Sequence, residues 1–280
     1  MAKRITELTS ATSLAETDVL PIVDVSDTTQ ATSGTTKKSA LSLIADYIKT
    51  RVETLTNKTL ISPLFGGTID GWIDAQETWT YASATTITVP SGAASKYQKG
   101  DKIKLTQTTV KYFYVVGVAD TVLTVTGGSD YTVANAAITS PYYSKIENPQ
   151  GFPQYFSFTP SWTNLTPGSG TNRGRFTLIG RTVHFVVEFV FGTGSAVGTA
   201  AVKLARPIPN TDSSWSALVA NALYLDAGVS AYVGNMVDNG DLTLINCSGT
   251  YSAMNYVSTN IPFTWGADDL IAISGTYEMV

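Results

Sequence analysis

Charged side chains are scarce in this chain. Of its 280 residues, only 14% are Asp, Glu, Lys or Arg, against about 25% in a typical globular domain. Basic residues adjoin each other only at Lys3–Arg4 and Lys37–Lys38, and the formal net charge is −4. Proteins that bind nucleic acids neutralise phosphates with clustered Lys and Arg. We therefore expect no nucleic-acid partner.

Cysteine and histidine occur once each. Cys247 is the sole cysteine, which excludes an intrachain disulfide and a cysteine-based zinc site. We predict that it is a small buried side chain in a strand near residues 242–247. His184 is the sole histidine, so schemes that need paired histidines fail. Its position in the middle of a predicted strand favours a surface site in a cross-strand polar pair.

Long apolar runs and phosphate-binding motifs are also missing. No stretch of about 18 apolar residues occurs, so we expect no membrane insertion. Residues 1–7 carry charge but lack the apolar segment of a signal peptide, which predicts a protein made in a cytoplasm and not exported by the general secretory route. The glycine pairs at 66–67 and 127–128 match neither a P-loop nor a dinucleotide-binding fingerprint.

Two carboxylates alone can hydrolyse a glycoside, so aspartates are the remaining catalytic candidates. Asp238 and Asp241 flank Asn-Gly, which is a turn signature, and neither this pair nor Asp268–Asp269 has the spacing of an EF-hand. We therefore expect no catalytic, cofactor-binding or metal residues and predict that the chain is not an enzyme. The candidates considered were Asp226, Asp238, Asp241, Asp268 and Asp269.

One amphipathic helix is predicted, from Ser39, a suitable N-cap, to Leu55. Its apolar residues are spaced alternately four and three apart, which places them on one seam. Two heptads are too short to be stable alone, so the seam packs either on its own chain or, as we favour, in a bundle of three subunits. The seam residues are Leu41, Ala45, Ile48, Val52 and Leu55.

The rest of the chain has the pattern of a mainly β protein. Short alternating segments follow one another from residue 84 to 126 and predict a small β-barrel or sandwich over 63–148. A segment with two prolines and a glycine, 148–153, marks a boundary. Beyond it, Arg181–Phe191 has an apolar residue at every second position from Val183 to Phe191, with Thr182, His184 and Glu188 on the other face. We predict an antiparallel β-sandwich of jelly-roll type over 149–280.

The N-terminal segment 1–38 has short apolar stretches separated by Ser/Thr-rich ones. We expect a tail with little core of its own, ordered where it docks on another protein; a disordered tail is the alternative. The expected domains are the tail at 1–38, the trimerising helix and linker at 39–62, and the two β-domains at 63–148 and 149–280.

Aromatic residues are many for a chain with so little charge: fourteen Tyr and five Trp. Tyr and Trp supply large contact areas with a polar handle, and recognition usually lies on loops. Four aromatics in segments predicted as loops are therefore candidate binding residues. The alternative, that these rings pack between subunits, is left open. They are Trp215, Tyr232, Tyr251 and Tyr256.

Three groups of segments together resemble tail fibre and minor tail proteins of tailed bacteriophages. The first is Thr54-Leu-Thr-Asn-Lys-Thr-Leu-Ile-Ser-Pro63, similar to a segment that joins an attachment region to a fibre shaft. The second begins at Tyr97-Gln-Lys-Gly-Asp-Lys-Ile-Lys-Leu-Thr-Gln-Thr108 and resembles a small β-module of phage structural proteins. The third is Ile179-Gly-Arg-Thr-Val-His-Phe185 with Pro262-Phe-Thr-Trp265, similar to the distal β-sandwich of fibres.

This resemblance implies a homotrimeric fibre on the exterior of a virion, attached through residues 1–38 to other virion proteins. The C-terminal head would bind a host surface glycan or protein. The alternative is a purely structural head fibre, collar or capsid decoration protein.

Overall fold

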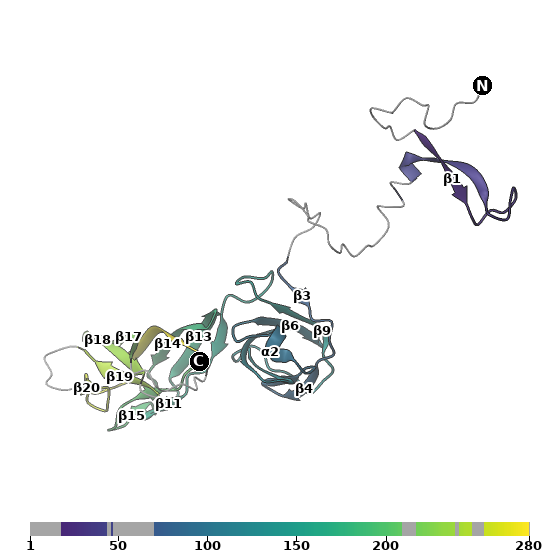
Figure 1. Cartoon of the computed structure of the whole chain (residues 1–280). Coiled ribbons are helices and arrows are strands. Elements are labelled where there is room, and N and C mark those ends of the chain that lie inside the picture. Colours follow the sequence, from purple (N-terminus) through teal and green to yellow (C-terminus); the bar gives the residue numbers. More distant parts are fainter. Residues whose placement is uncertain are drawn as a thin grey trace. The chain divides into compact units, whose positions relative to one another are not determined.

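The computed structural model describes residues 18–43, 46, 70–208, 217–238, 241–247 and 255–279. The chain divides into two compact units, residues 1–65 and 66–280 (Figure 1). The prediction of a mainly β protein with antiparallel sheets is confirmed. No helix within the described ranges is long and apolar enough to cross a membrane.

In the first unit, β1 (Val19–Asp24) and β2 (Thr35–Ala40) form an antiparallel hairpin. The connecting loop is tied to β2 by Lys37, whose ammonium lies 2.9 Å from Asp24 and 2.8 Å from Asp27. Hydrogen bonds from Ser26 and Lys37 lower the pKa of Asp24 to about 2. The N-terminal segment, expected to be a tail with little core of its own, thus contains the strand β2, in which Thr35 and Thr36 favour extended backbone.

The predicted helix is partly described. Leu41 is helical and directly follows β2. Ser39 lies inside β2 and is buried, so its prediction as the helix N-cap is wrong: it pairs with Leu20 across the hairpin. The other seam residues lie outside the described residues: Ala45, Ile48, Val52 and Leu55.

Seven described strands of the second unit form its first sheet, in the order β3-β9-β6-β7-β8-β5-β4. Their inward side chains and a short helix, α2 (Ala93–Lys96), enclose a core that includes Trp79, Ile103 and Phe113. The strands are β3 (Ile73–Asp74), β4 (Thr80–Ser83), β5 (Thr86–Thr88), β6 (Lys102–Gln107), β7 (Thr109–Val118), β8 (Val122–Thr126) and β9 (Thr139–Ser144).

Ten of the strands described beyond residue 155 form a second sheet, in which nine follow the order β10-β13-β14-β21-β17-β18-β19-β16-β11 and β20 pairs with β19. β12 and β15 pair separately. The strands are β10 (Phe156–Phe158), β11 (Trp162–Thr163), β12 (Leu165–Thr166), β13 (Thr171–Ile179), β14 (Thr182–Val190), β15 (Ala196–Val197), β16 (Lys203–Leu204), β17 (Ala217–Asp226), β18 (Ser230–Asp238), β19 (Leu242–Asn246), β20 (Asn255–Tyr256) and β21 (Leu270–Glu278).

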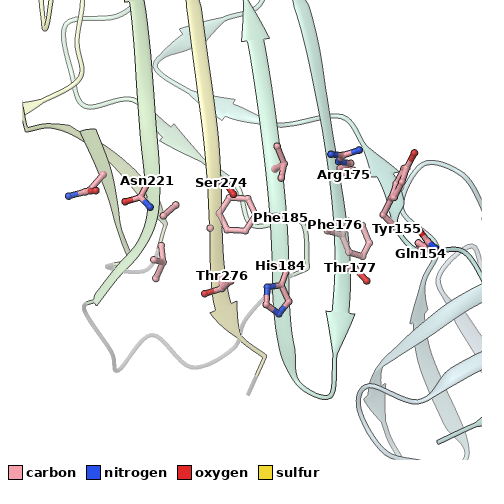
Figure 2. A pocket seen from close by; sticks show the side chains of 15 residues that line it. Gln154, Tyr155, Arg175, Phe176, Thr177, His184, Phe185, Asn221, Ser274 and Thr276 are labelled. Atoms are coloured by element: carbon pink, nitrogen blue, oxygen red, sulfur yellow. The ribbon is translucent and has the colours of Figure 1, made fainter. Parts of the chain in front are cut away.

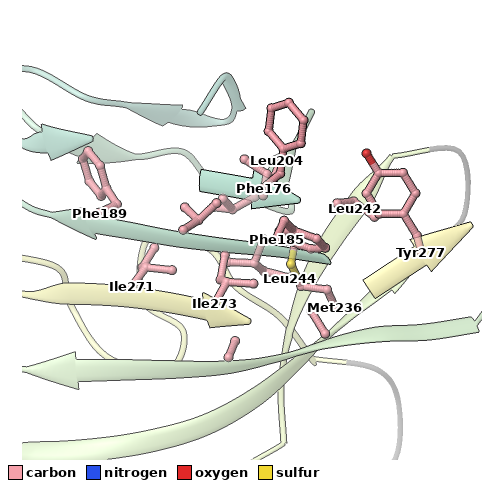
Figure 3. Close-up of a cluster of buried hydrophobic side chains, with 14 of the residues drawn as sticks. Phe176, Phe185, Phe189, Leu204, Met236, Leu242, Leu244, Ile271, Ile273 and Tyr277 are labelled. Carbon is pink, nitrogen blue, oxygen red and sulfur yellow. The ribbon is translucent and has the colours of Figure 1, made fainter. Parts of the chain in front are cut away.

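This second sheet curls over a single apolar core (Figure 3). The ring of Trp162, in β11 at one end of the strand order, lies 6.0 Å from that of Phe189 in β14. The Trp162 indole also donates a 2.9 Å hydrogen bond to Asn172 of β13. The two faces expected of a sandwich are therefore made by one continuous sheet whose ends approach each other.

Two local predictions in this region are wrong. Tyr232, expected in a loop, lies in the interior strand β18, because the Ser/Asn/Gly content of residues 230–238 obscured the alternation of buried and exposed positions. Cys247 is exposed. It follows the last residue of β19, Asn246, and the buried positions of that strand stop there.

Aromatic rings join the two sheets of the second unit. Phe152, in the connection where the domain boundary was expected, packs 5.9 Å from Tyr112 and 5.0 Å from Tyr114 of β7. Tyr114 also hydrogen-bonds Thr177 of β13 through its hydroxyl, at 3.1 Å. The backbone N–H of Ser157 donates to Asp130 at 2.7 Å. These contacts place both sheets in one compact unit.

The buried carboxyl of Asp101, directly before β6, predicts that the stability of the protein depends on pH. Asp101 is 2% exposed, and burial raises its pKa above the ordinary value. A carboxyl whose pKa is higher in the folded state than in the unfolded state, where it is about 3.9, stabilises the fold while it is protonated. That stabilisation is lost as the pH rises through the pKa of the folded state. We expect Asp101→Asn to become progressively more stable than the wild type as the pH rises from about 4 toward neutral.

Urea unfolding across this pH range, with the exposed Asp74→Asn as a charge-loss control, measures the effect. Asn can still accept the backbone N–H of Gln98 that Asp101 accepts at 3.0 Å. A stability difference that is the same at pH 4 and pH 7 would contradict the prediction.

Candidate functional site

A hollow of about 750 Å³ lies on the outer face of the second sheet. Figure 2 shows its side chains coming from adjacent strands, with Gln154 and Tyr155 beside β13. The lining residues are Gln154, Tyr155, Arg175, Phe176, Thr177, His184, Phe185, Val186, Val219, Ala220, Asn221, Asn235, Ser274, Gly275 and Thr276.

Strand alternation decides which side chains face this hollow. In β14, Val183, Phe185 and Val187 are buried, so His184 and Val186 between them point to the opposite face. The pairing register places Thr177 and Thr276 directly across from His184 on either side. The predictions that His184 lies on the sheet surface and in a cross-strand polar pair are therefore confirmed.

A second row crosses the same face. Arg175 pairs with Val186, Val186 with Ser274, and Ser274 with Asn221 across β13, β14, β21 and β17. Asn221 in turn pairs with Asn235 of β18. The row brings together residues separated by up to 99 positions in the sequence, and it presents amides, a hydroxyl and a guanidinium on one surface.

One wall of the hollow is aromatic. Tyr155 directly precedes β10 and is 49% exposed. The guanidinium of Arg175 lies 5.0 Å from the centre of its ring. A cation at this distance from a tyrosine ring is attracted by the ring quadrupole. The contact therefore helps to hold an exposed aromatic face at the edge of the hollow.

The hollow continues into two smaller ones. A hollow of about 560 Å³ shares Tyr155, Arg175 and Val186 with the first. A third, of about 310 Å³, shares Ser129, Phe158 and Thr159 with the second. Because each adjoins the next through common lining residues, the three form an extended depression, which we call the groove.

The chemistry of the groove suits binding. No carboxylate is found among the described residues that line the 750 Å³ hollow, whereas glycoside hydrolysis needs a pair. In the second hollow Glu188 is ion-paired with Arg173 at 2.6 Å. Hydroxyls, amides, a guanidinium and an exposed ring can donate and accept hydrogen bonds and stack on a ligand.

The aspartates considered as catalytic candidates lie elsewhere. Asp238 pairs with Arg206 and Asp241 with Lys203. Asp269 is buried and accepts the backbone N–H groups of Ala227 and Gly266. No group of three or more His, Cys, Asp and Glu that could hold a metal ion is found in the described part of the chain.

The aromatics predicted to bind a receptor are not brought together at the groove. Tyr232 lies in β18, not in a loop, and its ring packs 5.4 Å from that of Phe263. Tyr256 lies in β20 and is 36% exposed. Neither lines any of the three hollows. Trp215 and Tyr251 lie outside the described residues.

Sequence reasoning missed Tyr155 and Arg175, together with the polar row from Ser274 to Asn235. A usable signal was present, because Arg173, Arg175 and Thr177 alternate with apolar or small residues, as do Ser274 and Thr276. That pattern marks the outer face of a strand, although it does not indicate which strands are neighbours.

Comparisons of the chain with protein-family models, with curated proteins and with solved structures give no match.

Proposed function

We propose that this chain is a fibre-type adhesive protein that binds a saccharide in the groove of its C-terminal sheet. The observation that carries the proposal is the 750 Å³ hollow, whose described lining combines an exposed aromatic wall with hydroxyl and amide side chains from neighbouring strands and includes no carboxylate. Binding, and not catalysis, is the role this donor set supports.

A saccharide fits this chemistry better than an apolar ligand. Sugars present many hydroxyls, which Asn221, Asn235 and Ser274 can bind as donors and acceptors. They also present flat faces of C–H groups, on which the exposed ring of Tyr155 can stack. Rigid strands hold most of these side chains, and a site on strands loses less conformational freedom on binding than a site on loops.

The virion setting is supported by the resemblance to phage fibre segments and by the N-terminal hairpin. Val19 and Val23 of β1 are 53% and 57% exposed, and a two-stranded hairpin is marginally stable alone. We propose that residues 1–38 attach to other virion proteins and that the protein lies on the virion exterior, on a tail or a capsid, after synthesis in the host cytoplasm. The host surface saccharide is then the receptor.

The proposed fibre is a homotrimer. We expect sedimentation equilibrium of the full chain to give about three times the 29.8 kDa monomer mass, with no change on dilution, since permanent oligomers bury large interfaces. Cross-linking after dilution provides an independent check. A single species of monomer mass would contradict the trimer and leave the groove proposal untouched.

Alanine substitutions test the groove as the receptor site. We expect Tyr155→Ala and Asn221→Ala each to weaken binding to host cells by about tenfold or more, the equivalent of about 1.4 kcal/mol. Both side chains are exposed, so stability should change little. Thr182→Ala, on the outer face of β14 but outside the groove, is the control. Unchanged attachment of both groove variants to host cells would exclude this site.

A purely structural role is the second candidate, and a specific observation favours it. Val186, Leu223 and Val233 on the same outer face are 40%, 39% and 61% exposed, and Leu223 and Val233 are cross-strand partners. Another protein covering this face would bury them. In that case the groove variants would lower the melting temperature of the assembly and leave host attachment unaffected.

A further inference from the structure

The groove has a charge opposite to that of the whole chain. The chain is acidic, with a formal net charge of −4, and yet the described residues that line the 750 Å³ hollow include Arg175 and no Asp or Glu. In the adjoining hollow, the carboxylate of Glu188 is neutralised by Arg173, at 2.9 Å from its Nε and 2.6 Å from Nη2. Among the described residues that line the two hollows, Arg175 is the charged side chain that no ion pair compensates.

Arg175 occupies the point where the two hollows meet. It lines both, and so does Tyr155. Within the described part of the chain, no carboxylate lies within ion-pair distance of the Arg175 guanidinium, which instead lies over the Tyr155 ring at 5.0 Å. A guanidinium that contacts an aromatic ring through its flat face keeps the N–H donors, which lie in the guanidinium plane, free for a planar or tetrahedral oxyanion.

Building on the proposed function, we propose that the saccharide bound in this groove is anionic, and that Arg175 binds its acidic group while Tyr155 stacks on the sugar. The shared chemistry is an oxyanion on a sugar ring, either the carboxylate of a uronic acid or a phosphate ester. Asn221, Asn235 and Ser274 bind the neutral hydroxyls of the part that lies in the larger hollow.

Matched ligand pairs test the charge requirement on the full-length protein by calorimetry. Trigalacturonate and its methyl ester differ in the charge of the carboxyl groups, and pentamannose phosphate and mannopentaose differ in the phosphate. We expect the wild type to bind the acidic member of at least one pair about tenfold or more tightly than the neutral member, and to lose that preference at high salt. The pair that shows the preference identifies the acidic group.

Two variants test whether the charge of Arg175 is responsible for the preference for the acidic saccharide. Arg175→Gln should bind the acidic and neutral members of that pair equally. The double variant Lys203→Gln/Asp241→Asn removes an ion pair that lies outside all three hollows without changing net charge, and it should keep the wild-type preference. The side chains of Arg175, Lys203 and Asp241 are accessible to solvent, and thermal unfolding confirms that each variant is folded. If Arg175→Gln does not fold, the salt dependence of the wild-type preference provides the test.

The outcomes separate this inference from the function on which it rests. Equal binding of acidic and neutral members by the wild type, abolished by Tyr155→Ala, would overturn the anionic preference and leave the saccharide site standing. An acidic preference that survives Arg175→Gln would overturn the assignment to Arg175. If the wild type binds none of the four saccharides, the inference is overturned. Loss of host-cell attachment in Tyr155→Ala would even then support the groove as a receptor site.

Discussion

Replacing Arg206 with leucine is expected to lower the free energy of unfolding by about 3–5 kcal/mol, because it removes the cation that forms an ion pair with a buried carboxylate. The side chains of Arg206 and Asp238 are each 9% exposed and form an ion pair. Asp238 ends β18, so the pair links that strand to the segment after β16. Urea unfolding of the purified protein measures the loss.

The double variant Arg206→Leu/Asp238→Leu distinguishes the charge effect from lost packing. Replacing both members of a buried ion pair with apolar residues is often close to neutral, so the double variant should recover much of the stability that the single variant loses. Equal destabilisation in both variants would show that the lost packing or hydrogen bonds of Arg206, and not the lost ion pair with Asp238, account for the decrease in stability.

Phe156→Ala is expected to cost about 3–5 kcal/mol, the range for truncating a buried phenylalanine. The side chain is fully buried, and its ring lies 5.3 Å from Tyr114, 5.6 Å from Phe152 and 6.0 Å from Phe176. These neighbours belong to the first sheet, the connection and the second sheet. The cavity should therefore weaken the contact between the sheets as well as the core.

Calorimetry of the variant measures both effects. Phe158→Ala, two residues further along β10 and only partly buried, is the matched control and should cost less. We also expect the two sheets of the wild type to unfold in one transition, as a single compact unit does, and Phe156→Ala to separate them. Two separate transitions in the wild type would contradict this coupling.

Much of the fold was predictable from local pattern. The apolar residues at every second position from Val183 to Phe191 predict one buried face in an extended strand, whatever its neighbours are. That pattern alone placed His184 on the outer face and indicated a mainly β chain. The absence of paired histidines and clustered basic residues likewise directed the functional prediction toward binding.

Only the tertiary structure decided where the groove lies. β21 is inserted between β14 and β17, and this pairing places Ser274 between Val186 and Asn221. Such a register depends on which long-range pairing buries the most apolar surface, and no local signal encodes it. Alternation along each strand therefore determined the face on which a side chain lies. The side chains that became its neighbours, and hence the binding chemistry, depended on how the whole sheet curls around its core.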